Sequence, residues 1–332
     1  DCSSTGLNHH PHPCRRCPVQ PCGCPDIAHS QPVAQPVCGL RDHLLAARLA
    51  EGPDDGSRLA GIAGDGAALA AAVEAIRAGS IVAVKGIGGY HLVCDARDYT
   101  VVDELRWRKH RPTKPLAVMF PLQGEDGLDR VRQYADLSTA EAALLKSPAR
   151  PIVLVSKNGN NDLARNVAPG LAELGVFLPY SPLHQLLLET FGAPLVATSG
   201  NISGEPVLTG NDEAAHRLDA IADAFLHHDR PIVRPADDPV YRHIGGAMRP
   251  IRIGRGAAPR EMTLPWPLPQ ALLAVGGHMK GTVALAWERR VVVSPHIGEM
   301  DSPRSLAVFE QVAADLQALY GVAAERIVCD AH

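Results

Sequence analysis

From about residue 66 onward, helical patterns alternate with short apolar strand patterns, and this alternation allows only a few folds. An alanine-rich helical pattern over 66–78 ends at Gly79 and leads into the apolar run 80–84. This element order predicts an α/β domain whose strands are buried between helices. The further predicted elements are helices at 101–108, 139–146, 183–190 and 212–221 and strands at 116–120, 151–155 and 194–197.

A second α/β pattern follows the proline-rich segment 259–269, which predicts a domain boundary. The segment after this connector is short for an independent α/β core. We therefore expect it to be the beginning of a second domain. Its predicted elements are strands at 272–276, 283–287, 290–294 and 326–329 and a helix at 302–320.

Composition and charge narrow the class of protein. The chain has 332 residues, 46% of them hydrophobic, so it buries a sizeable core and we expect more than one domain. A net charge of -4 argues against a protein that coats nucleic acid broadly, because such binding needs many cationic contacts to phosphate. No apolar run reaches the roughly 18 residues that cross a bilayer, and no hydrophobic signal segment follows the N-terminus. We expect a cytoplasmic protein without a membrane partner.

The first sixty residues are rich in proline, histidine and cysteine and show little apolar periodicity. Five of the eight cysteines lie between Cys14 and Cys38. Close clustering in a chain without a signal segment favours a metal site over a disulfide framework. We expect a small Cys/His-rich segment that needs a metal or a neighbouring domain to fold.

Three clusters of cationic, hydroxyl and amide side chains lie beside predicted element ends. Such groups can hold a triphosphate and an acyl carboxylate together, which points to an enzyme that uses ATP. Each cluster also has a structural interpretation of its own, as a tight glycine turn, a solvated cationic helix end or a Ser/Asn turn. The clusters are Lys85 with Gly88, then Lys109, Arg111 and Lys114, and finally Thr198, Ser199, Asn201 and Ser203.

Together the clusters resemble the YrdC-like domain family. In that family a Lys-x-Arg pair and a Ser-x-Asn pair line the nucleotide and acyl site, and the matching residues here are Lys109 with Arg111 and Ser199 with Asn201. The resemblance implies an α/β fold built on a twisted mixed sheet with helices. It makes these four residues the predicted catalytic set.

Longer strings narrow the resemblance to the HypF family of hydrogenase-maturation carbamoyltransferases. The resemblance extends over nearly everything from residue 29 onward. It implies that the start of an actin-like ATPase-fold (ASKHA) transfer domain follows the YrdC-like domain, with Gly276, Gly277 and Lys280 similar to its nucleotide loop. The strings that carry it are 108–119, 178–184, 250–256, 274–280 and 294–300.

The resemblance implies a carbamoylation step in the synthesis of the cyanide ligands of NiFe hydrogenase. In the family, ATP and a carbamoyl group from carbamoyl phosphate give carbamoyl-adenylate and pyrophosphate, and the carbamoyl group then passes to the C-terminal cysteine of the partner HypE. The cationic loop would neutralise the triphosphate while hydroxyl and amide groups orient the carbamate. Mg2+ is expected to bridge phosphate oxygens.

A wider set of residues is expected at the nucleotide. His184, at a predicted helix start, either reaches the ligand or caps and packs its helix. Asp237 and Asp238 would hold Mg2+ or pair with Arg255. The expected nucleotide-binding residues are Lys85, Gly88, Lys114, Ser181, His184, Thr198, Ser203 and Arg255.

The zinc module implied by the resemblance departs from the family pattern. The family uses two Cys-x2-Cys pairs, which suit tetrahedral coordination of Zn2+. Cys14 and Cys17 form one pair. In the second pair only Cys38 is present, because Gln35 stands at the position of its partner cysteine. Another cysteine or a nearby histidine would have to complete the site. The alternatives are a zinc-bearing module on Cys14, Cys17 and Cys38 or an unliganded remnant.

Two further departures concern the ends of the sequence. The family begins with an acylphosphatase domain that this sequence does not contain, which leaves the opening of carbamoyl phosphate without an assigned site. The His-rich metal motif of the transfer domain comes after the position of His332. We therefore expect adenylate formation but no transfer on this chain. The expected parts are a degenerate zinc-finger-like segment at 1–50, a YrdC-like domain at 60–258, the linker 259–269 and a truncated transfer domain at 270–332.

Two other functions share these features. A threonylcarbamoyl-adenylate synthase for tRNA modification has the same fold and pocket, but the Cys-rich lead and everything after Pro259 argue against it. The second is a non-catalytic module that binds RNA, including double-stranded RNA, or a maturation partner. The intact four-residue set argues against that module. Metal content and nucleotide binding would separate these alternatives.

Overall fold

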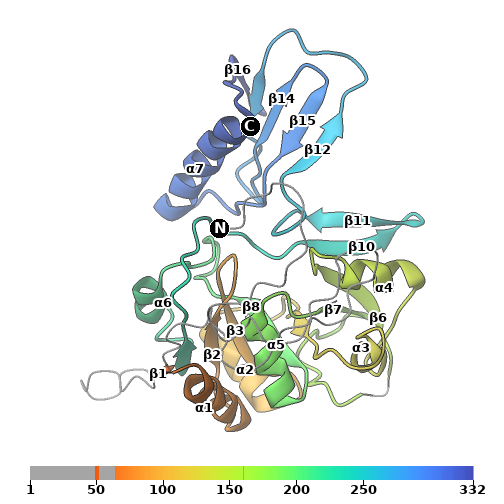
Figure 1. Ribbon diagram of the computed structural model, residues 1–332, viewed down its shortest axis with the longest axis vertical. Helices are drawn as coiled ribbons and strands as arrows, with labels where there is room; N and C mark the ends of the chain where they lie inside the picture. The colour runs from red at the N-terminus through yellow and green to blue at the C-terminus, as the bar shows by residue number, and fades with distance from the viewer. Residues whose placement is uncertain (1–48, 52–63, 160, 332) are drawn as a thin grey trace, which may run out of the picture. The chain divides into compact units, whose positions relative to one another are not determined.

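The computed structural model describes residues 49–51, 64–159 and 161–331, which form two β-sheets with their helices (Figure 1). The predicted zinc ligands Cys14, Cys17 and Cys38 lie outside the described residues. The larger sheet contains β1 (Leu49–Glu51), β2 (Val82–Lys85), β3 (Tyr90–Asp95), β4 (Val118–Met119), β5 (Ala135–Asp136), β6 (Ile152–Lys157), β7 (Glu173–Phe177), β8 (Leu195–Ser199), β9 (Ala224–Leu226), β10 (Val240–Ile244) and β11 (Ala247–Arg252). Its helices are α1 (Asp65–Arg77), α2 (Tyr99–Arg108), α3 (Asp129–Arg132), α4 (Thr139–Lys146), α5 (Pro182–Phe191) and α6 (Asn211–Arg217).

The larger sheet is mixed, as expected. Its strand order is β1-β9-β2-β3-β8-β4-β7-β6-β10-β11, with β5 paired to β6. The pairs β2/β9, β4/β7 and β6/β10 run parallel. β3 pairs antiparallel with β8, so that His91 lies opposite Ser199. This pairing brings the glycine turn after β2 and the hydroxyl cluster at the end of β8 to the same part of the sheet.

Helices cover both faces of the larger sheet, and the side chains of β2 show how. Val82 and Val84 pack in the core that contains α1 and α5, whereas Ala83 belongs to the core that contains α2. All three residues are fully buried. A strand buried on both faces needs a continuous apolar run, which is the pattern that predicts this strand.

Local capping signals fix the ends of two predicted helices. α4 begins with a capping box, in which the side chains of Ser138 and Glu141 each accept a backbone hydrogen bond from the other residue. α5 begins with Ser181 at its N-cap and Pro182 in its first turn. It ends at Gly192, whose φ is 81°. These signals explain why both helices lie where the sequence predicts them.

The smaller sheet has the strand order β12-β15-β14-β13-β16. Leu285, Val292 and Leu316 join its strands to α7 in a separate apolar core. Within the described part of the chain, no helix combines the length and apolarity that crossing a bilayer requires. The elements are β12 (Arg260–Thr263), β13 (Leu272–Ala274), β14 (Ala284–Trp287), β15 (Arg290–Val293), α7 (Pro303–Tyr320) and β16 (Arg326–Val328).

Some elements differ from the sequence expectation. Strand β12 lies inside the proline-rich segment 259–269, where the sequence predicts a connector, and it pairs with β15. The additions to the expected set are the short helix α3, the strands β1, β3, β5, β7 and β9, and the hairpin β10–β11. Helix α6 ends at Arg217, four residues before the end of the predicted helix 212–221. β11 contains Pro250 and alternates exposed with half-buried residues, because it is an edge strand. An edge strand of this kind shows no apolar run in the sequence.

Candidate active site

Two adjoining cavities, each of about 260 Å³, lie beside the carboxyl end of β8. The first cavity is lined mainly by apolar side chains such as Leu116, Ile152 and Val240. The second cavity is lined mainly by charged and polar side chains. Both cavities share Arg111, Ser199, Asp237 and Arg252. The shared residues make the cavities two ends of one site, one apolar and one charged.

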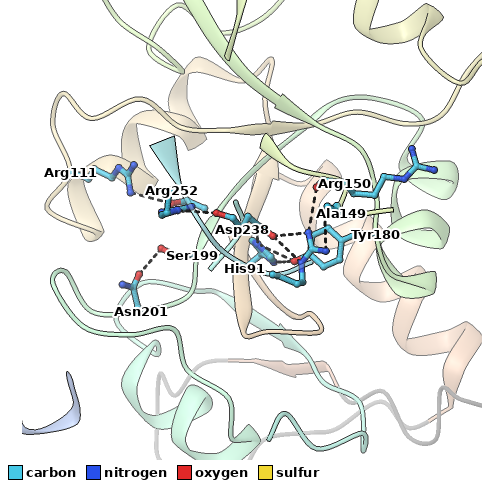
Figure 2. A network of polar contacts seen from close by, with 11 residues as sticks. His91, Arg111, Ala149, Arg150, Tyr180, Ser199, Asn201, Asp238 and Arg252 are labelled. Atoms are coloured by element: carbon cyan, nitrogen blue, oxygen red, sulfur yellow. Dashed lines mark hydrogen bonds and ion pairs between the residues drawn. The ribbon is translucent and has the colours of Figure 1, made fainter. Parts of the chain in front are cut away.

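Four segments of the larger sheet meet at this site. Arg111 follows the C-terminus of α2, Ser199 ends β8, Asp237 precedes β10 and Arg252 ends β11. The last two segments are joined, because Arg252 Nε donates to the carbonyl of Asp238 at 2.9 Å. Figure 2 shows Arg111, Ser199 and Arg252 in one region of the molecule. The site therefore depends on chain segments that are far apart in the sequence.

Lys109 is buried behind the hydroxyl cluster, with 6% of its surface exposed. Its Nζ donates to the carbonyl of Ser199 at 2.6 Å and to both the carbonyl and Oδ1 of Asn201 at 2.9 Å. An ammonium has three protons, so these bonds use all of its donors. Burial, and then the charge of Arg111, lower the pKa of Lys109 to about 7, although Asp237 opposes the shift. Lys109 thus orders the turn at 199–201.

The turn at 199–201 is fixed from the side of β3 as well. Ser199 Oγ donates to Asn201 Oδ1 at 2.7 Å, and Asn201 Nδ2 donates to the carbonyl of Glu205 at 2.6 Å. The backbone N of Gly200 donates to the carbonyl of Tyr90 at 2.6 Å. A Cβ on Gly200 would lie 2.6 Å from the Cβ of Tyr90, so only glycine fits at the centre of the turn.

Arg111 brings a guanidinium group to both cavities. Its Nη2 donates to the carbonyl of Pro115 at 2.9 Å, and its Nη1 lies 3.4 Å from Thr198 Oγ1. Burial lowers the pKa of Arg111, and the charges of Arg106 and Arg252 lower it further. Cations held this close to one another favour an anionic ligand. Three residues of the predicted nucleotide-binding set lie here, because Thr198 lines the first cavity and Lys114 and Ser203 line the second.

A buried polar network supports the segment that carries Asp237 (Figure 2). Asp238 Oδ2 lies 2.9 Å from His91 Nε2, and Asp238 Oδ1 accepts from Arg255 Nη2 at 3.0 Å. The guanidinium of Arg255 lies over the ring of Tyr180, 3.3 Å from its centroid. Burial alone would raise the pKa of Asp238, but the charges and hydrogen bonds of His91 and Arg255 outweigh it and hold this pKa well below its usual range. Pairing with Arg255, one of the two roles expected of Asp238, is confirmed.

The structure does not bring Lys85 and Gly88 of the glycine turn to either cavity. Lys85 Nζ donates to Asn211 Oδ1 at 2.7 Å and to the carbonyl of His228 at 3.0 Å. The carbonyl of Gly88 accepts from the backbone N of Ala236 at 2.9 Å. A Cβ on Gly88 would lie 2.4 Å from the carbonyl oxygen of Ala236. The glycine therefore serves close packing against the chain, and the lysine joins β2 to the segment after β9.

Three more expected nucleotide-binding residues lie outside the lining of both cavities. Ser181 accepts the backbone N–H of His184 as the N-cap of α5. His184 itself is fully buried, and its ring packs edge-on against that of Tyr180. Arg255 turns toward Asp238 and the Tyr180 ring. These contacts give the three residues structural roles.

Several cavity residues lie outside the predicted set. Arg252 and Asp237 line both cavities. The sequence predicts no role for Arg252, and for Asp237 it predicts only binding of Mg2+ or pairing with Arg255. Lys280 and His296 line the second cavity from the smaller sheet. The sequence signal for Lys280 is its likeness to a nucleotide loop of the transfer domain, and Arg252 lies within the matching string 250–256.

Asp237 is the residue that fits the expected Mg2+ best. Among the described residues, it is the only acidic side chain that lines both cavities. Its carboxylate lies 3.9 Å from His296 Nε2, whereas the neighbouring Asp238 is paired with Arg255. Mg2+ usually takes one or two carboxylates together with substrate phosphates. Across the described ranges, no group of three or more His, Cys, Asp or Glu side chains is arranged to hold a metal ion.

Comparison with known protein families gives two matches. Residues 74–254 match the Sua5, YciO and YrdC family, described as "Telomere recombination". Residues 268–332 match the HypF Kae1-like domain. The predicted YrdC-like α/β sheet is confirmed, and a HypF Kae1-like domain follows it.

Individual relatives agree with the family matches. The carbamoyltransferase HypF of Synechocystis sp. is 46% identical over 80% of this chain and 34% of its own length. A crystal structure of full-length HypF in the phosphate- and nucleotide-bound form matches with a TM-score of 0.76 and 37% identity over 86% of this chain and 36% of that chain. The threonylcarbamoyl-AMP synthase of Bos taurus is 30% identical over 46% of this chain and 58% of its own length. The chain spans about a third of the length of the HypF proteins that it matches.

Proposed function

We infer that this chain, which belongs to the YrdC-like family, is within that family a HypF carbamoyltransferase. We propose that its two cavities bind ATP and a carbamoyl group and join them as carbamoyl-adenylate. The observation that carries this proposal is the sharing of Arg111, Ser199, Asp237 and Arg252 by an apolar and a charged cavity. A nucleotide has one apolar end and one highly charged end, so it complements both cavities at once.

The reaction is a displacement at the α-phosphorus of ATP. A carbamate oxygen bonds to this phosphorus, the bond to the bridging oxygen of the β-phosphate breaks, and pyrophosphate leaves with the electron pair. Arg111 and Arg252 lie where the cavities meet, so they balance the charge around the reacting phosphate. Ser199 orients the carbamate, and Lys109 holds the turn that carries Ser199. Mg2+, when bound, neutralises phosphate charge, and Asp237 is the residue that would hold it.

The carbamoyl source and the acceptor follow from the family. Carbamoyl phosphate would supply the group, and the C-terminal cysteine of HypE would finally receive it, in the synthesis of the cyanide ligands of NiFe hydrogenase. Residues 60–258 would form the adenylate, 259–269 would act as connector, and 270–332 would begin the transfer domain. The cytoplasm is the compartment that suits this chemistry, because it supplies ATP and keeps an acceptor cysteine reduced.

A threonylcarbamoyl-adenylate synthase for tRNA modification would use the same kind of cavity. The relative with that activity in its name matches 46% of this chain, against 80% for the HypF relative. The match to the HypF Kae1-like domain over 268–332 and the contribution of Lys280 to the second cavity also favour the carbamoyl reaction. The threonylcarbamoyl reaction therefore ranks second.

Pyrophosphate release tests the proposal. The purified chain is incubated with ATP, Mg2+ and either carbamoyl phosphate or ammonium bicarbonate, which contains carbamate at equilibrium. We expect release that needs one of these carbamoyl sources and that falls about a hundredfold in Ser199→Ala and Lys109→Ala. Asp136→Asn, at an exposed position of β5, is the control and should keep its activity.

Two outcomes would contradict the carbamoyl assignment. Release that requires threonine with bicarbonate, and that neither carbamoyl source supports, would assign the threonylcarbamoyl reaction instead. Binding of ATP without release under any of these conditions would indicate a module that binds nucleotide but does not form an adenylate.

A further inference from the structure

The second cavity takes part of its wall from the smaller sheet. Lys280 lies in the loop between β13 and β14, and Lys114 lies in the cationic loop after α2. We propose that these two lysines together hold the β- and γ-phosphates of a nucleoside triphosphate, so that the smaller sheet completes the polyphosphate site. This inference deepens the proposed function and rests on it.

Lys114 and Lys280 carry ammonium groups that are available to a ligand. Within the described part of the chain, neither side chain has a hydrogen-bond or ion-pair partner, and both residues are exposed. Lys109, the third lysine of the cavity, differs because the turn at 199–201 uses all of its protons. Two free ammonium groups at one cavity repel each other in the unliganded chain, and a bound polyanion removes that repulsion.

The acidic side chains of the second cavity do not balance its cations. Glu205 is already paired with Arg217 at 2.7 Å. Asp237 and Glu299 are the remaining carboxylates in the lining of this cavity. Against them stand the cationic side chains Arg111, Lys114, Arg252 and Lys280. The excess of positive charge fits a ligand with several negative charges, as a polyphosphate has.

Backbone hydrogen bonds hold the loop of Lys280 beside the larger sheet. The N of Gly281, the next residue, donates to the carbonyl of Gly298 at 2.7 Å. The segment of Gly298 is tied in turn to the end of β11, because the N of His296 donates to the carbonyl of Ile253 at 2.7 Å. Backbone contacts of the neighbouring residues therefore fix the position of Lys280, and its side chain remains available to bind the ligand.

The position of Lys280 selects the part of the nucleotide that it meets. Arg111 and Arg252 line both cavities and would lie at the α-phosphate, whereas Lys280 and Lys114 line only the second cavity. With the nucleoside in the first cavity, the phosphates beyond the α-phosphate extend into the second. The two lysines should therefore distinguish a triphosphate from a monophosphate.

Isothermal titration calorimetry of the whole chain with ATP, pyrophosphate and AMP tests this inference. We expect Lys280→Gln to weaken the binding of ATP and of pyrophosphate about tenfold and to leave AMP binding unchanged. Lys114→Gln should show the same pattern, and Lys280→Arg should restore binding. Arg326→Ala, which removes an exposed cation of β16 outside both cavities, is the matched control.

The outcomes separate this inference from the proposed function. Normal ATP affinity in Lys280→Gln would overturn the role of Lys280 and leave adenylate formation intact. An equal loss for ATP and AMP would also overturn it, because the lysine would then act on the nucleoside or the α-phosphate. If the unchanged chain bound neither ATP nor pyrophosphate, the proposed function itself would fail.

Discussion

His91 Nε2 lies 2.9 Å from Asp238 Oδ2, and this contact joins strand β3 to the segment that precedes β10. The other oxygen of the same carboxylate accepts from Arg255 at 3.0 Å. Asp237, the preceding residue, lines both cavities. A buried ion-paired carboxylate thus fixes the segment whose preceding residue, Asp237, lines both cavities. We therefore expect Asp238 to contribute both to the stability of the fold and to the position of Asp237.

Asp238→Asn keeps the shape of this side chain and removes its charge. Arg255 and His91 would remain beside an uncharged amide, so we expect the free energy of unfolding to fall by about 3 kcal/mol. Urea denaturation followed by circular dichroism measures this change. Asp136→Asn, the exposed control, should stay within about 0.5 kcal/mol of the unchanged chain. Equal stability of the two variants would show that the buried network does not support the fold.

Gly254 lies directly against the segment that carries Asp237. A Cβ on this glycine would lie 2.2 Å from the carbonyl oxygen of Asp237, which is backbone and cannot swing away. We expect Gly254→Ala to lose about 2 kcal/mol or more of stability and to weaken ATP binding, because the segment has to shift. Thermal unfolding checks the first effect. Gly66→Ala is the control, because Gly66 lies in the first turn of α1 and an added Cβ there meets nothing within 4 Å. This variant should keep or slightly raise the melting temperature. Equal losses of thermal stability in both variants would contradict this explanation.

His184 makes stability depend on pH in the acid range. Burial, and then the nearby His91, hold the pKa of His184 well below the usual 6.5, with Arg255 and His228 lowering it and Asp238 opposing the shift. The fold therefore keeps the ring neutral, whereas the unfolded chain binds a proton below pH 6.5, so stability should fall as the pH drops through 6.5. Neither ring nitrogen has a hydrogen-bond partner among the described residues.

His184→Leu should remove this contribution. We expect the variant to remain within about 1 kcal/mol of the unchanged chain at pH 7, to lose less stability between pH 7 and pH 5, and to keep pyrophosphate release. Denaturation curves over this range provide the comparison. Identical pH slopes in the two proteins would show that His184 is not the group that makes stability depend on pH. Loss of pyrophosphate release in a folded variant would show instead that His184 acts at the ligand.

Lys109 makes ATP binding depend on pH near neutrality. Its pKa of about 7 belongs to the unliganded chain, and bound polyphosphate would favour the charged form and raise it. Binding should therefore be strongest below pH 7 and weaken above it, by up to about tenfold per pH unit. Lys109→Gln cannot titrate, so it should bind ATP more weakly and without this slope. Calorimetric titrations from pH 6 to pH 9 compare the two, and a shared slope would assign the effect to ATP itself.

Elements with local sequence signals could be predicted, whereas strands that depend on pairing with distant segments could not. The capping residues Ser138 and Ser181 mark their helices locally, and the buried β2 is marked by its apolar run. Strand β3 starts directly after a glycine turn, and β11 contains Pro250 at a sheet edge. Pairing with distant strands, and not local composition, makes these segments strands.

The residues of the candidate site also divide into those marked by a local sequence motif and those placed by long-range strand pairing. Lys109, Ser199 and Asn201 are predicted together, and the structure joins them by hydrogen bonds. Arg252 reaches the cavities only because the hairpin β10–β11 adds to the sheet beside β6, which no local pattern indicates. Ser181 belongs to a local pattern that serves equally for ligand binding and for a helix cap, and here it forms the cap.

If the residues shared by both cavities form one adenylate-forming site, the chain should exchange labelled pyrophosphate into ATP. We predict that the chain forms labelled ATP only when carbamoyl phosphate or carbamate is present. Arg252→Gln should reduce this exchange about a hundredfold, while Arg249→Gln, an exposed position on the same strand, should retain it. Exchange that does not need a carbamoyl source, or that survives in Arg252→Gln, would show that the shared residues do not form a carbamoyl-adenylate.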